Sequence, residues 1–133
     1  MNFTTHALAG AALGVHVGAP AAAVAIGLTS HLVLDIIPHH DVTDWRGVLL
    51  DVSVGATAFY LLRSCLAAAG WWGALAATAP DLEVALRHFG LWRGRCGFPT
   101  HNGYHLHGRW SPIPGTLIQL PFGLASLAFI LVR

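Results

Sequence analysis

The sequence predicts an all-α fold, a compact bundle of about five helices that is embedded in a membrane. The chain of 133 residues is 55% hydrophobic and 10% charged, and its mean hydropathy is +0.61. Soluble domains carry about 25% charged residues. Apolar stretches of helical length alternate with breaks that contain Gly or Pro, and no stretch has the period-two alternation of a strand. This length suits one domain, residues 1–133.

Five helical segments are expected, each ended by a Gly or Pro break or by a polar loop. They cover about 5–17, 20–37, 48–69, 73–89 and 115–132. Gly18-Ala19-Pro20 separates the first two segments. Gly70-Trp71-Trp72 is expected to turn the chain between the third and the fourth. Pro80 is expected to kink or restart the fourth segment, and Pro121 to kink the last.

The composition of the segments favours a membrane over water. The first two are rich in Ala and Gly, which lets helices approach closely in lipid, and the third is nearly long enough to cross a bilayer. A multi-pass protein of the inner membrane, in contact with membrane lipid, is therefore expected, and its apolar surface favours a homo-oligomer. The alternative is a soluble helical bundle. A nucleic-acid partner is not expected, because the seven basic residues are few and do not follow one helix.

Ionisable side chains gather where the second segment ends. His31 and Asp35 are four residues apart and therefore project from one helix face. His39 and Asp41 follow directly after Pro38. Such groups are costly to bury without a partner, and a divalent metal is the simplest partner for all of them. A plain ion pair at a helix end is the alternative for His31 and Asp35.

The expected topology brings further ionisable residues to the same place. Neighbouring helices with short connections are antiparallel, so one end of the bundle holds His6, Asp51 and Asp81 beside the group at His31. The loop 90–114, which carries several histidines, opens at that end too. The sequence therefore predicts a polar metal site at one end of the bundle.

The candidate residues divide by the role that their chemistry suits. The expected metal ligands are His6, His31, Asp35, His39, Asp41, Asp81, His101 and His105. Imidazoles with carboxylates suit zinc, and manganese, iron or nickel are the alternatives; a metal lowers the pKa of its bound water. Asp51 and His107 are the expected catalytic residues, with His107 protonating a leaving group. Arg95 and Arg109 are expected to bind a substrate phosphate.

The arginines predict which side of the membrane the site faces. Those expected at the histidine end are Arg46, Arg87, Arg93, Arg95 and Arg109, whereas Arg133 marks the far side. Loops rich in arginine stay cytoplasmic. The site is therefore expected to face the cytoplasm.

Several short motifs resemble a known family. Ser30-His31 through Leu34-Asp35, then Pro38-His39 and Asp41, resembles a pattern of small bacterial membrane proteins. More distantly, the chain resembles the inner-membrane metal-dependent hydrolases typified by YdjM, themselves similar to zinc-dependent phospholipase C. The corresponding elements are Thr5-His6, Pro80-Asp81-Leu82-Glu83 and Thr100-His101-Asn102, where Glu83 and Asn102 replace an aspartate and a serine of the family.

This resemblance implies a metal-dependent hydrolase that acts at the cytoplasmic membrane edge on a small-molecule or lipid-derived phosphoester. Two alternatives remain at the level of the sequence. One is a membrane scaffold without catalysis, in which a metal stabilises the bundle. The other is a haem-binding membrane protein with His6 or His31 as an axial ligand.

Overall fold

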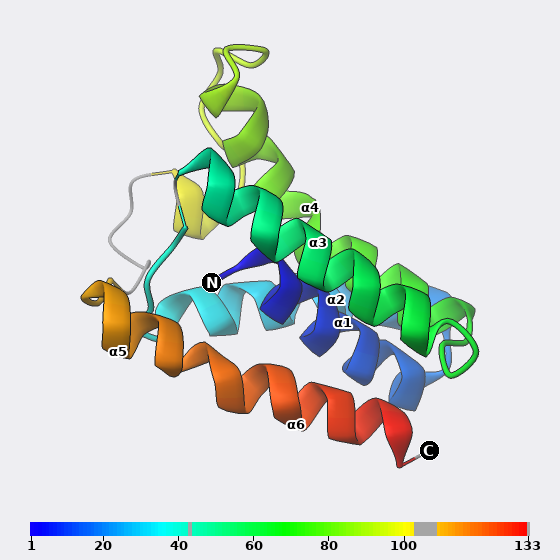
Figure 1. Ribbon diagram of the computed structural model, residues 1–133. Coiled ribbons are helices and arrows are strands. Elements are labelled where there is room, and N and C mark those ends of the chain that lie inside the picture. The colour runs from blue at the N-terminus through cyan, green and yellow to red at the C-terminus, as the bar shows by residue number, and fades with distance from the viewer. Residues whose placement is uncertain (43, 103–108, 133) are drawn as a thin grey trace.

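The protein is an all-helical bundle, as the sequence predicts (Figure 1). The computed structural model describes residues 1–42, 44–102 and 109–132. Its helices are α1 (Phe3–Val17), α2 (Pro20–Ile36), α3 (Trp45–Leu62), α4 (Ala68–His88), the 3-10 turn η1 (Pro99–His101), α5 (Pro112–Leu117) and α6 (Gln119–Leu131). Within these described ranges there is no strand, and one isolated bridge pairs His39 with Arg109.

The boundaries of the early helices follow from local chemistry. Gly18 ends α1 in the left-handed region, at φ 75°, and Pro20 occupies the first turn of α2. Asp44 caps α3, because its carboxylate accepts hydrogen bonds from the backbone N–H groups of Arg46 (3.1 Å) and Gly47 (3.0 Å). The predicted break between the first two helices is confirmed.

The expected turn at Gly70-Trp71-Trp72 is wrong. The third helix already ends at Leu62, and α4 begins at Ala68, so these three residues lie in the first turns of α4. The physical reason is packing, because Gly70 is buried against Val15 of α1. Its missing side chain serves a close contact between helices rather than a turn.

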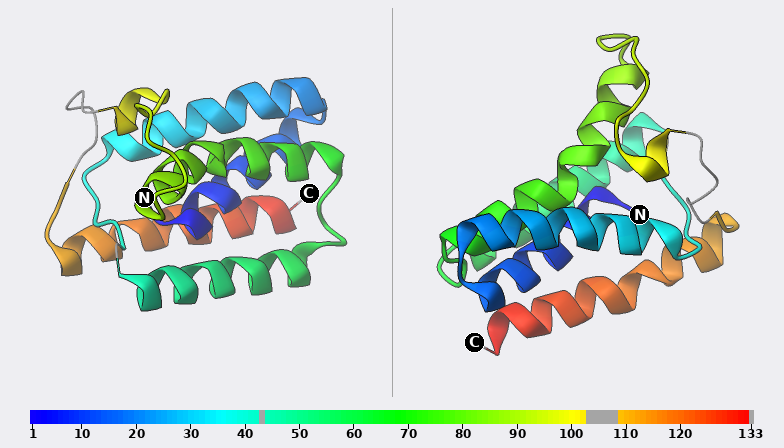
Figure 2. Two further views of the ribbon diagram at one scale, coloured as in Figure 1. Left: turned by 90° about the horizontal axis from the view of Figure 1, so that it is seen from above. Right: turned by 180° about the vertical axis from the view of Figure 1, so that it is seen from behind.

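The prolines act inside or beside helices. Pro80 does not restart α4, which is continuous from Ala68 to His88 and bends along its length (Figure 2), as an interior proline causes. The last segment begins at Pro112, three residues before its expected start. It is interrupted at Ile118, one turn before Pro121, which has no N–H to donate to the Leu117 carbonyl.

Helix α1 lies at the centre of the bundle. It packs against α2 and α4 on one side and against α3 and α6 on the other (Figure 2). Glycines make the contact with α4 very close, because a Cβ atom placed on Gly73 would lie 2.2 Å from the Gly10 carbonyl oxygen. The small residues of the first two helices thus permit close approach as predicted, and their partner is α4.

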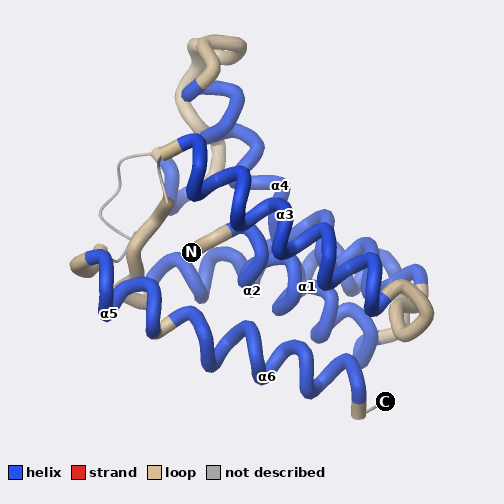
Figure 3. Tube along the Cα trace, viewed as in Figure 1, coloured by secondary structure: helices blue, strands red, loops and turns tan. Residues whose placement is uncertain are grey.

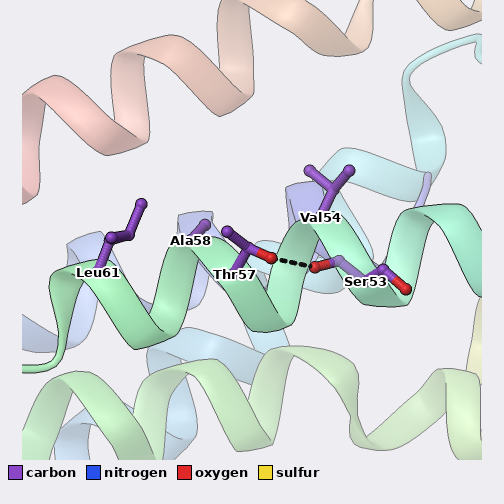
Figure 4. Close-up of a pocket in the computed structure, with 5 residues that line it drawn as sticks. All are labelled: Ser53, Val54, Thr57, Ala58 and Leu61. Carbon is purple, nitrogen blue, oxygen red and sulfur yellow. Dashed lines mark hydrogen bonds between the residues drawn. The ribbon is translucent and has the colours of Figure 1, made fainter.

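Two helical stretches are long and apolar enough to cross a membrane. They are Trp45–Leu62 and Pro112–Leu131, of which 11% and 22% is buried inside the protein. The flank of α3 carries a shallow hollow of about 370 Å³ (Figure 4), lined by Ser53, Val54, Thr57, Ala58 and Leu61. No side chain of this lining is ionisable, so the hollow suits apolar material rather than a charged substrate.

The two ends of the bundle differ. The N-terminus, the α2–α3 loop and η1 lie at one end, and the α1–α2 and α3–α4 connections lie at the other (Figure 3). The apolar core cluster, which includes Val15, Leu62, Leu66 and Ile130, contains residues next to these two connections. The chemistry-bearing side chains therefore gather at the end away from this part of the core.

Candidate metal centre

Five ionisable side chains from four elements meet in the interior. They are His6 on α1, His31 and Asp35 on α2, Asp81 on α4 and His101 on η1. The side chains of His6, His31 and Asp35 are fully buried, with 0% of each residue exposed. The structure therefore brings five of the eight expected metal ligands into one cluster, here called the imidazole cluster.

Asp35 lies at the middle of the imidazole cluster. Its Oδ1 is 3.1 Å from Nε2 of His6. Its Oδ2 is 3.1 Å from Nε2 of His31 and 3.2 Å from Nε2 of His101. Oδ1 of Asp81 lies 3.9 Å and 3.8 Å from the same two nitrogens of His31 and His101. These donors form two overlapping groups that could each hold a metal ion, His6 with His31 and Asp35, and His31 with Asp81 and His101, in which the ligand atoms lie within 4.8 Å of one another.

The tautomer of His31 directs a lone pair into this space. Its Nδ1 lies 2.6 Å from the Ala77 carbonyl oxygen, to which it donates. In a neutral ring Nε2 then carries the lone pair, and this lone pair faces the Asp35 carboxylate. Two electron-rich atoms in that position repel each other unless a cation or a proton lies between them. Backbone carbonyls fix metal-binding histidines in the same way.

Buried polar atoms without hydrogen bonds support the same interpretation. Nε2 of His6, Nε2 of His31 and Oδ2 of Asp81 are buried and make no hydrogen bond with the residues that the structure describes. Buried polar atoms almost always have partners, and each exception calls for a reason. A metal ion among these atoms would supply the missing partner.

Burial and neighbouring charges set the protonation of the imidazole cluster. Burial lowers the pKa of His6 to about 3, which keeps its ring neutral, and burial raises the pKa of Asp81 to about 6. Burial would also raise the pKa of Asp35, but contacts with the rings of His101, His31 and His6 outweigh it and hold that pKa well below its usual range. Burial would lower the pKa of His101, but the carboxylates of Asp35 and Asp81 raise it. The cluster thus combines a neutral nitrogen donor at His6 with a carboxylate at Asp35 that stays charged.

Thr100 is a part of the site that the sequence did not single out. Its hydroxyl donates a 2.7 Å hydrogen bond to Oδ2 of Asp35, and the residue is 4% exposed. Glu83 supports this arrangement from α4, because its carboxylate accepts hydrogen bonds from the N–H groups of Gly97 (2.8 Å) and Phe98 (3.3 Å). Glu83 therefore tethers the loop that leads to Thr100 and His101. The Thr-His pair itself was the available sequence signal.

Replacing Thr100 with valine is expected to lower the affinity for a divalent metal about tenfold, because partners of this kind orient ligands and tune their basicity. Titration of chelator-stripped protein with zinc by isothermal calorimetry measures the change. Thr78→Val is the matched control, since that hydroxyl bonds the carbonyls of Ala74 and Leu75 in its own helix. Equal affinities in both variants would contradict a role for Thr100.

His39 and Asp41 lie beside Asp35, next to the imidazole cluster. Nε2 of His39 is 2.8 Å from Oδ1 of Asp41. The amino group of Met1 joins them to the cluster, because it donates a 3.0 Å hydrogen bond to Oδ1 of Asp35 and lies 2.5 Å from Nε2 of His39. No residue pattern could point to this amino group, because a main-chain group carries no residue signature.

The other expected site residues have different surroundings. Asp51 accepts weak 3.4 Å hydrogen bonds from the N–H of Thr4 at the start of α1, and its own carbonyl accepts one of 2.7 Å from the Thr4 hydroxyl. Arg95 and Arg109 are exposed, and Arg109 pairs with His39 through the backbone. His105 and His107 lie outside the described residues. The structure thus leaves the catalytic and substrate-binding assignments of these residues as predictions.

One hollow of the surface reaches the imidazole cluster. It measures about 340 Å³ and is lined by Val84, Arg87, His88, Cys96 and His101. The guanidinium of Arg87 lies 3.7 Å from the Cys96 sulfur. His101 and the cationic side chain of Arg87 therefore line the same hollow.

Comparison with known proteins adds no relative to this picture. The chain matches no protein-family model, no curated protein and no solved structure. The geometry of the imidazole cluster is therefore the ground on which a function can be proposed.

Proposed function

We propose that the protein is a membrane-bound, metal-dependent hydrolase. In this proposal His6, His31, Asp35, Asp81 and His101 hold a divalent cation that activates a water molecule for attack. The observation that carries it is the lone pair of His31, which the Ala77 carbonyl directs at a buried carboxylate. Mixed nitrogen and oxygen donors favour zinc, with manganese, iron or nickel as the alternatives.

The substrate that this site suits best is a phosphoester. The motif resemblance to the YdjM-like hydrolases implies that class. The hollow beside His101 supports it, because the Arg87 guanidinium in its wall suits an anionic oxygen. Arg95 and Arg109, which are exposed, remain candidates for the same task. A substrate derived from lipid would also fit a site that lies next to apolar helices.

Elemental analysis and turnover together test this proposal. We expect the purified chain to contain zinc or manganese and to hydrolyse members of a phosphoester panel, with both properties lost after chelation. His31→Ala is expected to lose the metal and at least 100-fold of the activity, because it removes a nitrogen ligand that both groups of donors share. His16→Ala is the matched control, since His16 contacts the Phe129 carbonyl at the other end of the bundle (3.0 Å).

Each other outcome has a definite meaning. Metal-free protein with full turnover would exclude the metal mechanism. Bound metal without turnover on any phosphoester would favour the alternative of a membrane scaffold without catalysis, in which the ion only holds the helices together. A haem held between His6 and His31 is excluded, because their rings stack with centroids 3.9 Å apart and leave no room for a porphyrin. A Soret band in the purified protein would instead support a haem bound to one of the two rings with a ligand from another helix.

Placement in the inner membrane is part of the proposal. The exposed side chains of α3 include Leu50 and Leu61, at 66% and 68%, which suits contact with lipid chains. Aromatic and arginine pairs stand at both ends of α3, where Arg46 covers the Trp45 ring and Arg63 covers the Tyr60 ring. Such residues are enriched at both interfaces of a bilayer.

The orientation that we propose places the imidazole cluster on the cytoplasmic side. The sequence assigns five arginines to that end, whereas Arg63 follows α3 at the other end and Arg133 lies outside the described residues. The expectation from the sequence did not include Arg63. With Arg63 included, the end that holds the imidazole cluster still carries more arginines than the other end.

Thiol labelling of intact cells is expected to reach Cys65 and not Cys96. Cys65 is exposed in the α3–α4 connection, at the far end from the imidazole cluster, whereas Cys96 is buried. A maleimide that does not cross membranes should therefore label the wild-type chain, and Cys65→Ser should abolish the label. Labelling of Cys65 only after the cells are opened would reverse the proposed orientation, and release of the chain by alkaline carbonate would exclude a membrane-spanning protein.

A further inference from the structure

A second set of metal donors lies against the Oδ1 atom of Asp35. The amino nitrogen of Met1 is 3.0 Å from this oxygen, 2.5 Å from Nε2 of His39 and 3.4 Å from Oδ1 of Asp41. Three donor atoms from three side chains thus surround one positively charged nitrogen. The structure marks this point as a place that favours a cation.

The tautomer of His39 supports this interpretation. Its Nδ1 donates to the Ile37 carbonyl at 2.6 Å, so a neutral ring carries its lone pair on Nε2. Nε2 lies 2.8 Å from Oδ1 of Asp41 and also faces the Met1 ammonium. A proton on Nε2 would point at the ammonium group, which is unfavourable. A lone pair there would face a carboxylate, which requires a positive charge between them.

The surroundings hold these donors in place. His39 is 1% exposed. The buried side chain of Gln119 accepts a 2.7 Å hydrogen bond from the N–H of Asn2 and donates one of 2.9 Å to the His40 carbonyl. Gln119 thereby fixes both the N-terminal segment and the loop that carries His39 and Asp41. These hydrogen bonds explain why Gln119 stands in a largely apolar last segment.

We propose that Asp35 bridges two cation positions. The first is the metal site of the proposed function, on which this inference rests. The second is formed by Oδ1 of Asp35, Nε2 of His39 and Oδ1 of Asp41, at the point where the Met1 amino nitrogen lies. A divalent transition-metal ion such as zinc or manganese takes this position, and the amino group moves aside.

The two positions differ in their access to water. His6, His31 and Asp35 are fully buried, whereas the Asp41 side chain is 38% exposed. The second ion therefore binds more weakly and exchanges faster. One imidazole and two carboxylates leave further coordination positions open to water or to a substrate oxygen. Two ions on either side of one carboxylate clamp the attacking and the leaving oxygen of a displacement.

Counting ions per chain tests the inference. Purified full-length protein is stripped with a chelator, loaded with zinc, separated from free metal and subjected to elemental analysis. We expect two ions per wild-type chain and one per chain in Asp41→Asn, which keeps its shape and loses its charge. Asp44→Asn is the matched control in the same loop. Asparagine caps a helix as well as aspartate, so this variant should keep two ions.

Loading with manganese gives an independent readout. Two ions that share Asp35 are coupled, so the electron paramagnetic resonance spectrum of the wild type should show exchange coupling that Asp41→Asn lacks. Thermal unfolding of the stripped proteins checks that Asp41→Asn folds like the control.

The outcomes separate the two proposals. No ion in the wild type would overturn both the metal site and the second position. One ion in the wild type would leave the proposed function standing and overturn this inference, with the Met1 ammonium alone supplying the charge. Two ions in Asp41→Asn would also overturn it, because the second ion would then lie elsewhere.

Discussion

Asp35→Asn is expected to abolish metal binding. It is also expected to lower the free energy of unfolding more than any other single substitution in the imidazole cluster. Asp35 contacts the rings of His6, His31 and His101, the Thr100 hydroxyl and the Met1 amino group. Within the described part of the chain, no other carboxylate contacts all of these groups. Removing one member of a buried ionic network costs about 3–5 kcal/mol, because the remaining charges lose their compensation.

The measurement combines metal content with thermal unfolding in detergent. We expect less than a tenth of the wild-type metal and a lower unfolding temperature, both with and without added zinc. Addition of zinc should raise the unfolding temperature of the wild type, since a ligand that binds the folded state stabilises it. The Asp44→Asn variant should behave as the wild type does. Wild-type metal content in Asp35→Asn would remove the basis of the metal site.

Gly73→Ala is expected to destabilise the bundle although alanine is the better helix former. A Cβ atom at Gly73 would lie 2.2 Å from the carbonyl oxygen and 3.0 Å from the carbonyl carbon of Gly10. Both atoms belong to the backbone and cannot rotate away, so α4 must move off α1. Overpacking of this kind costs about 1–3 kcal/mol, which exceeds the gain of about 1 kcal/mol in helix propensity.

The movement should also reach the metal site. His6 lies on α1, and Asp81 lies on α4 beyond Gly73, so a wider spacing of these helices separates their side chains. Thermal unfolding and zinc titration of Gly73→Ala measure both effects. Gly123→Ala is the control, because no atom lies within 4 Å of a Cβ added there, and it should be neutral or slightly stabilising. A Gly73→Ala protein as stable as this control would show that the contact can relax.

Local chemistry explains why some elements could be predicted from the sequence. Gly18 and Pro20 act through their own backbone preferences, so the break between α1 and α2 was predictable. The i, i+4 spacing of His31 and Asp35 fixes their common face in any helix. The convergence of His6 and Asp81 on that face followed from antiparallel connections alone.

Tertiary contacts explain what the sequence did not reveal. Gly70 has the signature of a turn but serves the packing of α4 on α1, which depends on residues more than 50 positions away. The Thr100 hydroxyl meets Asp35 across 65 residues. No local pattern encodes either contact. Helix termini were misplaced for the same reason, since packing decided where α3 ends and α4 begins.

The residues of the imidazole cluster lie far apart in the sequence, and this has a consequence for the synthesis of the protein. His6 is translated well before His101, and α2, α3 and α4 lie between them in the sequence. In the proposed metal site, the full set of ligands would therefore exist only after α3 and α4 have been synthesised. The supply of metal would then act late in biogenesis, and cells starved of it would accumulate chains without their ion.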